Sequence, residues 1–424
     1  MGAHQWVTPL VGHLMSATIV TTVEVKFSST GVTDISNRVI SANINYGRQR
    51  LLDEFGAGTA ILTLRKDDNY ITPGHSESTM GNLPDLIGSE VRIHASVTGG
   101  SDSYSSYLFR GQISDVDYLP NNDHQSARTI LKCCDGFVLL ARAKFEGQSF
   151  SEETTSTRVT NVLNLASVNY PSESYDRSIA TGSVTCLAAS SQSHSALDYL
   201  QQIARTENGK ILVNHAGTPT STNVGGVLEF IAKDTAPLAS GLTISDANSL
   251  SAGSIQADDI KLEFGSELLF NAYSITPASG SVQTGSNSVS VGKYGTRTLS
   301  RSVLSNTTDA NNAGSYYIGL YDEPSLRVSE VTLQADMATT ADAEKILHLN
   351  VNSALDLSIL PVGSSATLTG QYVVEGLSIE IIPKDMLTNK SSIKYTISTS
   401  AADTTAYWIL GDASLSVLPT ILGL

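Results

Sequence analysis

The chain of 424 residues carries 41 acidic and 26 basic side chains, for a net charge of −15 at neutral pH. This charge argues against a protein that binds duplex DNA tightly, which needs a basic surface, although an acidic surface can also serve solubility alone. The length exceeds that of one ordinary core, and a hydrophobic content of 41% is enough to form several. We therefore expect about two to four domains.

Three cysteines cannot build a disulfide framework, so we expect Cys133, Cys134 and Cys186 to be free thiols. Residues 1–23 contain no Lys or Arg and therefore lack the positive region of a secretory signal. The uncharged run 413–424 is too short to cross a bilayer. These features predict a protein that is made in a cytoplasm and does not insert stably into a membrane.

Residues 1–17 show little periodicity and read as an N-terminal arm. The first unit, residues 18–135, is rich in alternating apolar and polar residues, a period typical of half-buried strands. The alternation is clearest in Ile40–Tyr46, Ala60–Leu64 and Val91–Val97. Because this unit contains no convincing helix, it predicts a small β-barrel or sandwich.

The second unit, residues 136–245, contains two segments with apolar residues at helical spacing, 155–168 and 195–209. Two short strands are expected at 210–213 and 227–231. This pattern predicts a small α+β domain.

The third unit, residues 250–400, returns to strand patterns and ends in a meander of strands. It also holds a low-complexity stretch, 278–292, that we expect to be an unpacked loop, and a helical accessory segment near 305–350. Residues 401–424 form a C-terminal tail. The predicted fold class is mainly β: two β-barrel domains on either side of the α+β domain.

A charged segment, residues 47–55, joins the strands expected at Ile40–Tyr46 and Ala60–Leu64. It has no turn signature. Its side chains carry both signs, so it does not suit an anion site. It has two interpretations: a subunit interface, which we favour, or an exposed segment that crosses one end of a barrel. The candidate interface residues are Arg48, Arg50, Asp53, Glu54 and Phe55.

The sequence contains no convincing catalytic or metal-binding motif. The nearest match to a nucleophile elbow, Gly74–Ser78, lacks the second glycine. The eight histidines are scattered, and none lies three or four residues from another. Asp115 and Asp117 share one strand face, which is most simply a solvated surface. We therefore expect no enzyme activity, no cofactor and no metal.

The charged segment with its flanks, Ile44–Leu64, resembles the signature of minor tail proteins and tail-hub proteins of siphophages. Five further matches follow in the family's order: Cys134-Asp135-Gly136, the helix 195–209, Phe270-Asn271 before Tyr294–Arg297, Val373–Leu377 and Tyr407–Asp412. The chain departs from the family at Tyr46, where a basic residue is usual, and at Leu418–Thr420.

This resemblance implies a structural hub in the tail tip or baseplate of a virion, assembled in the host cytoplasm. It implies that each chain carries two tail-tube-like β-barrel domains, at about 18–135 and 250–400. It also implies a homotrimer whose six barrels form a ring and adapt six-fold tail symmetry to a three-fold tip. The implied partners are the distal tail protein ring, the tape-measure protein and tail fibre or tip proteins, while DNA passes through the lumen without specific binding. Two alternatives stay open: a carbohydrate-binding adhesin, although the only tryptophans are Trp6 and Trp408, and a hub with cell-wall hydrolase activity.

Overall fold

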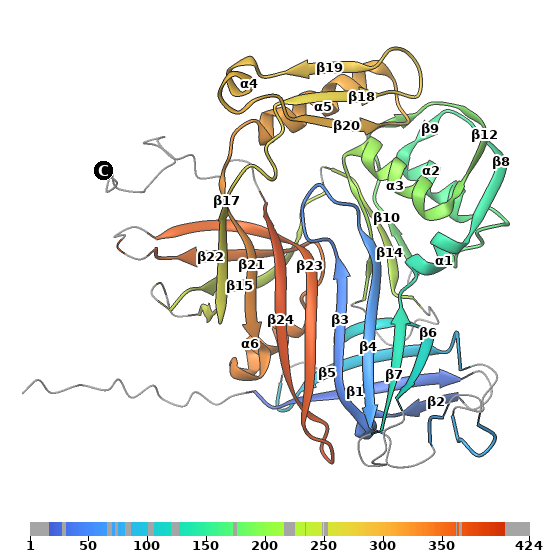
Figure 1. The fold of residues 1–424 in the computed structure, drawn as a ribbon, viewed down its shortest axis with the longest axis vertical. Helices are drawn as coiled ribbons and strands as arrows, with labels where there is room; N and C mark the ends of the chain where they lie inside the picture. The colour runs from blue at the N-terminus through green and yellow to red at the C-terminus, as the bar shows by residue number, and fades with distance from the viewer. Residues whose placement is uncertain are drawn as a thin grey trace, which may run out of the picture.

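The computed structural model describes residues 17–402 apart from short gaps, and Figure 1 shows their arrangement. The gaps are residues 28–30, 66–69, 73–74, 81–85, 101–105, 120–126, 173–175, 216–224, 234, 248, 250–252, 362 and 364–366. The predicted N-terminal arm and C-terminal tail therefore lie almost entirely outside the described residues. Long strands form the body of the molecule, with an α+β domain and a small lobe at one end (Figure 1).

Eight strands close into a barrel, in the order β23-β3-β4-β7-β6-β5-β1-β24, and β24 pairs again with β23. Their bounds are β1 Ile19–Phe27, β3 Val39–Gly47, β4 Gly56–Arg65, β5 Glu90–Val97, β6 Ser106–Leu119, β7 Arg128–Cys134, β23 Leu368–Asp385 and β24 Lys390–Ala401. Alternate residues point inward, so Ile44, Leu62 and Ile379 are fully buried in one core. This is the period-two pattern that the sequence predicts.

The barrel differs from the expected one in which strands form it. Only six of its strands come from residues 18–135, and β23 and β24 come from the third unit. The physical reason is that β3 and β1 would otherwise leave open edges. β3 pairs with β23 along Ala42–Gly47, and the start of β1 pairs with β24.

The same two strands also lie in the middle of a second run of paired strands, β16-β15-β22-β23-β24-β21-β17. The remaining strands of this run are β15 Leu238–Ser245, β16 Ile255–Gln256, β17 Asp259–Phe264, β21 Leu326–Gln334 and β22 Ser353–Ile359. Among the described residues this run is open, because β16 and β17 do not pair with each other. The two predicted β units are thus joined in one sheet through the hairpin of β23 and β24, which both units share. A short strand, β2 Gly31–Asp34, pairs with β1.

The two predicted helices of the α+β domain are confirmed as α2 Thr155–Leu163 and α3 Ala196–Glu207. The Ser195 side chain accepts a hydrogen bond from the Asp198 N–H and caps α3, and Asn208 ends it in the left-handed conformation. The fully buried Arg158 on α2 donates to the Tyr199 hydroxyl on α3 at 2.8 Å and so ties the helices together.

The domain's other elements are α1 Phe137–Arg142, β8 Lys144–Phe150, β9 Glu153–Thr154, β10 Arg177–Ile179, β11 Thr185–Cys186, β12 Ala189–Ser195, β13 Lys210–Asn214 and β14 Val227–Ile231. The two strands expected at 210–213 and 227–231 are confirmed as β13 and β14, which pair in antiparallel fashion.

A small lobe between β17 and β21 contains β18 Ala272–Thr276, β19 Gln283–Ser286, α4 Ser288–Tyr294, β20 Thr298–Ser302 and α5 Thr307–Tyr321. The prediction of an unpacked loop at 278–292 is wrong, because β19 and most of α4 lie there. β19 pairs with β18, and the Asn287 side chain caps α4. Polar composition hid these elements, since backbone pairing and a cap do not require apolar residues. Helices in the accessory segment are confirmed as α5 and α6 Thr340–Leu347.

The shared hairpin generates a prediction about folding. We expect residues 17–135 alone to lack cooperative unfolding, because two of the eight barrel strands are missing. A fusion of 17–135 to 368–402 through a flexible linker restores all eight strands and should unfold cooperatively in urea. Cooperative unfolding of residues 17–135 alone, followed by near-UV circular dichroism, would contradict this assignment of strands.

Candidate functional site: the connector junction

The charged segment between β3 and β4 begins where two glycines face each other. Gly47, with φ of +93°, is the register partner of Gly376 on β23. A Cβ on Gly47 would lie 2.4 Å from the Glu375 carbonyl oxygen, and a Cβ on Gly376 would lie 2.4 Å from that of Arg48. Only glycine permits this approach, and it places the connector, residues 48–55, directly against β23.

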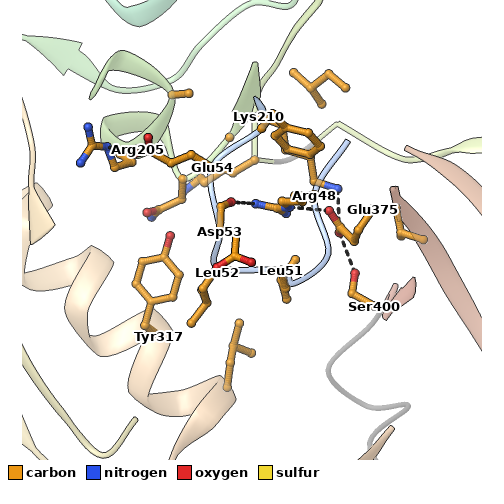
Figure 2. A pocket seen from close by; sticks show the side chains of 18 of the residues that line it. Arg48, Leu51, Leu52, Asp53, Glu54, Arg205, Lys210, Tyr317, Glu375 and Ser400 are labelled. Atoms are coloured by element: carbon orange, nitrogen blue, oxygen red, sulfur yellow. Dashed lines mark hydrogen bonds and ion pairs between the residues drawn. The ribbon is translucent and has the colours of Figure 1, made fainter. Parts of the chain in front are cut away.

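The first side chain of the connector, Arg48, points into the protein. Its Nε donates to Glu375 Oε2 at 2.7 Å, and its Nη1 donates to the Asp53 carbonyl oxygen at 3.0 Å. The guanidinium also lies 4.5 Å from the centre of the Phe55 ring. Figure 2 shows Arg48 between Asp53 and Glu375. Arg48 and the buried Phe55 therefore hold the connector to its own chain.

Glu375 is the centre of this junction and is only 1% exposed. Its Oε1 accepts hydrogen bonds from Lys210 Nζ at 3.1 Å and from the Ser400 hydroxyl at 2.7 Å. Burial by itself raises the pKa of the carboxyl, but the charges of Arg48 and Lys210 outweigh burial and lower the pKa to about 2. The carboxylate is therefore ionised at neutral pH and joins β23 to the connector, β13 and β24.

The outer side of the connector carries the other charges. Arg50 pairs with Glu267 at 2.7 Å, and Glu54 pairs with Arg205 on α3 at 3.1 Å. All four side chains are at least 30% exposed. Ion pairs this accessible to water contribute about 0–1 kcal/mol each. Arg50, Asp53 and Glu54 thus remain available at the surface, while Arg48 and Phe55 are occupied within the chain.

Backbone carbonyls of the connector bind two further parts of the protein. Gln201 on α3 donates to the Phe55 carbonyl oxygen at 3.0 Å, and Arg301 on β20 donates to that of Leu52 at 3.2 Å. The connector therefore contacts the sheet, the α+β domain and the lobe at once. Sequence reasoning found this segment but missed its partners, because Glu375 and Lys210 lie 327 and 162 residues beyond Arg48 (375 − 48 and 210 − 48).

A second buried cluster lies near the connector, where β4 and β7 meet the α+β domain. Asp135 accepts hydrogen bonds from the backbone N–H of Gly58 at 2.7 Å and of Phe137 at 3.0 Å. Burial raises the pKa of Asp135 to about 7 despite these bonds. A side chain at Gly58 would collide with Asp135, since its Cβ would lie 2.6 Å from Oδ2.

His215, at the end of β13, completes this cluster. Its Nδ1 accepts the Arg110 N–H at 3.2 Å, which leaves the ring proton on Nε2, 3.8 Å from Asp135 Oδ2. Burial, followed by the charge of Arg110, lowers the pKa of His215 to about 3, so the ring is neutral at neutral pH. Tyr46 packs edge-on against it, with ring centroids 4.6 Å apart. Tyr46, the position at which the sequence departs from the tail-hub signature, is therefore part of the core.

A broad polar face lies on the outer side of eight adjacent strands, in the order β17-β21-β24-β23-β3-β4-β7-β6. Figure 1 shows most of these strands side by side in the foreground. Rows of register partners cross this face, and their uncharged members include Asn43, Asn45, Thr59, Ser378, Thr396 and Ser398. The charged members are Arg65, Asp115, Asp117, Arg128, Lys132, Asp259, Lys261, Glu330, Glu380 and Lys394. Two exposed isoleucines, Ile61 and Ile382, lie in the same rows.

Each lysine of the polar face lies beside a carboxylate. Lys132 pairs with Asp117 at 2.6 Å and with Asp115 at 3.2 Å. Lys261 pairs with Glu263 at 2.7 Å, and Lys394 is the register partner of Glu380. Two arginines, Arg65 and Arg128, face each other at the end of β4 and the start of β7. Most of this face is therefore polar without an excess of cations.

The candidate catalytic groups do not form a site. His75 lies in an exposed turn, where its Nδ1 accepts the Glu77 N–H at 3.3 Å. Asp115 and Asp117 share Lys132 on an open strand face. Cys133 and Cys186 are buried free thiols, whose pKa values burial raises, and Cys134 is partly buried. Within the described ranges, no group of three or more His, Cys, Asp or Glu side chains is arranged to hold a metal. Among those residues, no helix is long and apolar enough to cross a membrane.

Glu375→Gln tests the junction. The substitution keeps the shape of the side chain but leaves Arg48 and Lys210 without their counter-charge. We expect the free energy of unfolding at neutral pH to fall by about 3 kcal/mol in urea titrations.

The same variant should lose part of its acid sensitivity. The folded-state pKa of Glu375, about 2, lies below its ordinary value of 4.5. Its stabilising effect is therefore complete above pH 4.5 and is lost as the pH falls toward 2. Glu380→Gln, on the exposed face of the same strand, is the control and should change little. An equal loss of stability in both variants would contradict the role of Glu375.

No family model matches the sequence, and no curated protein matches it. The solved structures that are similar across nearly the whole chain include two tail proteins. The tail protein from Neisseria meningitidis MC58 has a TM-score of 0.55 at 9% identity, with 92% of this chain and 98% of that one covered. The 43 kDa tail protein of prophage MuSo2 from Shewanella oneidensis has a TM-score of 0.53 at 11% identity, with 91% and 99% covered. This chain therefore has the fold of tail proteins, as its sequence signature predicts.

Proposed function

We propose that the chain is the structural hub of a phage tail tip or baseplate, in the virion, and that it acts without catalysis. The observation that carries this proposal is the polar face, combined with the likeness of the fold to tail proteins. A broad sheet with a polar outer side suits the wall of an aqueous channel. The siphophage type, suggested by the signature around the connector, belongs to the same proposal.

The two edges of this sheet support a closed ring. Among the described residues, β17 pairs only with β21, and Ser114–Leu119 of β6 pairs only with β7. Every neighbouring pair from β17 to β6 is antiparallel, so eight strands give the two edges opposite directions. The β6 edge of one copy can therefore continue as the β17 edge of the next copy in an antiparallel sheet.

Exposed apolar side chains occur on both edges. Leu262 and Phe264 on β17 are 38% and 56% exposed, and Leu119 on β6 is 51% exposed. Both edge strands also carry charges, Asp259, Lys261 and Glu263 on β17 and Asp115 and Asp117 on β6. Large exposed apolar side chains beside these charges nevertheless favour a partner strand.

The size of such a ring fits a conduit. Three copies supply 24 strands, which at about 4.8 Å per strand give a circumference of about 115 Å and a diameter of about 37 Å between backbones. Side chains that project about 5 Å from each wall leave a channel about 27 Å wide. This width admits a nucleic-acid duplex, and a wall whose lysines are paired with carboxylates would not retain phosphates.

In this proposal, the trimer joins the six-fold distal tail protein ring to a three-fold tip, beside the tape-measure protein and tail fibre or tip proteins. The division into an arm, two tube-like domains, an α+β domain and a tail is part of the same proposal. The exposed connector residues Arg50, Asp53 and Glu54 face a neighbouring protein in it.

Mass photometry tests the ring. We expect a particle of about 135 kDa, from three chains of 44.9 kDa each. The double variant Leu262→Glu, Phe264→Glu places charges on the β17 edge and should yield monomers with an unchanged circular dichroism spectrum. The control is Leu387→Glu, at a position that is 97% exposed in the β23–β24 turn, which should still form trimers. A wild-type chain that stays monomeric, or edge variants that still form trimers, would refute the ring.

Charge reversal tests the connector as an interface. Arg50→Glu breaks only an exposed ion pair, so we expect the melting temperature to change little. Formation of the trimer, or binding of the trimer to the distal tail protein ring, should weaken. Co-sedimentation measures both. If assembly is unchanged, residues 48–55 serve only as a connector within the chain.

A further inference from the structure

A cleft of about 560 Å³ opens beside the connector, and it lies between α3, the lobe and the end of β24. One wall is apolar and comes from the connector and the lobe: Leu51, Leu52, Phe270, Tyr316 and Leu320. Figure 2 shows Leu51, Leu52 and Tyr317 along one side of this space, below Asp53 and Arg48. Tyr316 is 53% exposed, so the wall presents an aromatic ring to the surface.

The described chain ends at this cleft. Ser400, Ala401 and Ala402 line it, and the Ala402 N–H donates to the Gln371 carbonyl oxygen at 2.9 Å. The next ten residues, 403–412, read Asp-Thr-Thr-Ala-Tyr-Trp-Ile-Leu-Gly-Asp. They contain four consecutive large apolar or aromatic residues, from Tyr407 to Leu410, and no cation.

We propose that the segment Tyr407–Leu410 fills this cleft in its own chain. Trp408 lies six positions after Ala402 (408 − 402), and an extended chain spans about 3.3 Å per residue, so Trp408 can reach about 20 Å from its anchor. This distance is sufficient to place Tyr407 and Trp408 against the apolar wall. The inference does not depend on the proposed trimer.

Charge favours the same occupant. The cleft is lined by five cations, Arg48, Arg205, Lys210, Lys233 and Arg301, and by three carboxylates, Asp53, Glu54 and Glu375, for a net charge of +2 (5 − 3). The segment brings Asp403 and Asp412, one on each side of the apolar run. An acidic segment with an aromatic centre therefore complements a cleft that is apolar on one wall and basic overall.

Residues 403–406 tether the apolar segment to the cleft, so weak binding is sufficient to keep the cleft occupied. A short linker gives an effective concentration of about 1 mM, so a segment with a Kd of about 0.1 mM in isolation occupies the cleft about 90% of the time. No tight intrinsic affinity is required.

Tryptophan fluorescence tests the proposal, because the chain has only Trp6 and Trp408. In the full chain carrying Trp6→Phe, all tryptophan emission comes from Trp408. We expect blue-shifted emission and poor quenching by acrylamide. Adding Tyr316→Glu, which puts a negative charge on the exposed part of the wall, should shift the emission to the red and increase quenching. The matched control Leu387→Glu, in a distant turn, should change neither.

Three outcomes would overturn the proposal. The first is emission of Trp408 like that of free tryptophan in the Trp6→Phe chain, and the second is a shielded Trp408 that does not respond to Tyr316→Glu. Shielding that disappears on dilution would assign the segment to the cleft of a second copy instead. A direct measurement uses a chain ending at Ala402 and a synthetic peptide of residues 403–412. We expect a Kd of about 0.1 mM by titration, weakened about tenfold by Tyr316→Glu.

Discussion

The structure depends on one buried charge. Glu375 interrupts an apolar strand, Val373-Val374-Glu375-Gly376-Leu377, and its carboxylate is almost fully removed from water. Such a charge is costly to bury unless its oxygens are paired, and here Arg48, Lys210 and Ser400 supply the pairing. Each partner comes from a different part of the chain. The requirement to satisfy a single carboxylate therefore fixes the connector, the α+β domain and the final hairpin relative to one another.

The backbone beside Glu375 also holds these parts of the chain together. The facing glycines Gly47 and Gly376 bring β3 and β23 close enough for the Arg48 N–H to donate to the Glu375 carbonyl oxygen at 2.8 Å. The hairpin of β23 and β24 then belongs to the closed barrel and to the second run of strands at once. Neither β unit is complete without these two strands, so the first and the last strands of the described residues pair in one sheet. A chain arranged in this way keeps a continuous eight-stranded outer face, which two independent barrels on flexible linkers would not provide.

The sequence predicts local structure well and long-range pairing poorly. Alternation identifies β3 and β4, and apolar spacing with a capping serine identifies α3, because both signals depend on nearby residues. The closure of the barrel by β23 depends on partners more than 300 residues away, and no local signal encodes it. The same limit applies to Asp135, whose neighbours Gly58 and His215 meet only in the fold. The lobe shows the opposite failure: a low-complexity composition concealed β19 and α4, which rest on backbone pairing and an asparagine cap.

The connector shows why a charged surface segment is ambiguous evidence for an interface. Its charges serve two purposes that sequence alone does not separate. Arg48 faces inward and neutralises Glu375, whereas Arg50 and Glu54 face outward and make exposed ion pairs with Glu267 and Arg205. An inward charge has its partner within the chain and gives no information about neighbours. Only the outward charges can exchange an intramolecular partner for one on another protein at small cost, because exposed pairs contribute little to folding. Arg50, Asp53 and Glu54 are therefore the connector residues that an interface would use, while Arg48 and Phe55 hold the segment against its own chain.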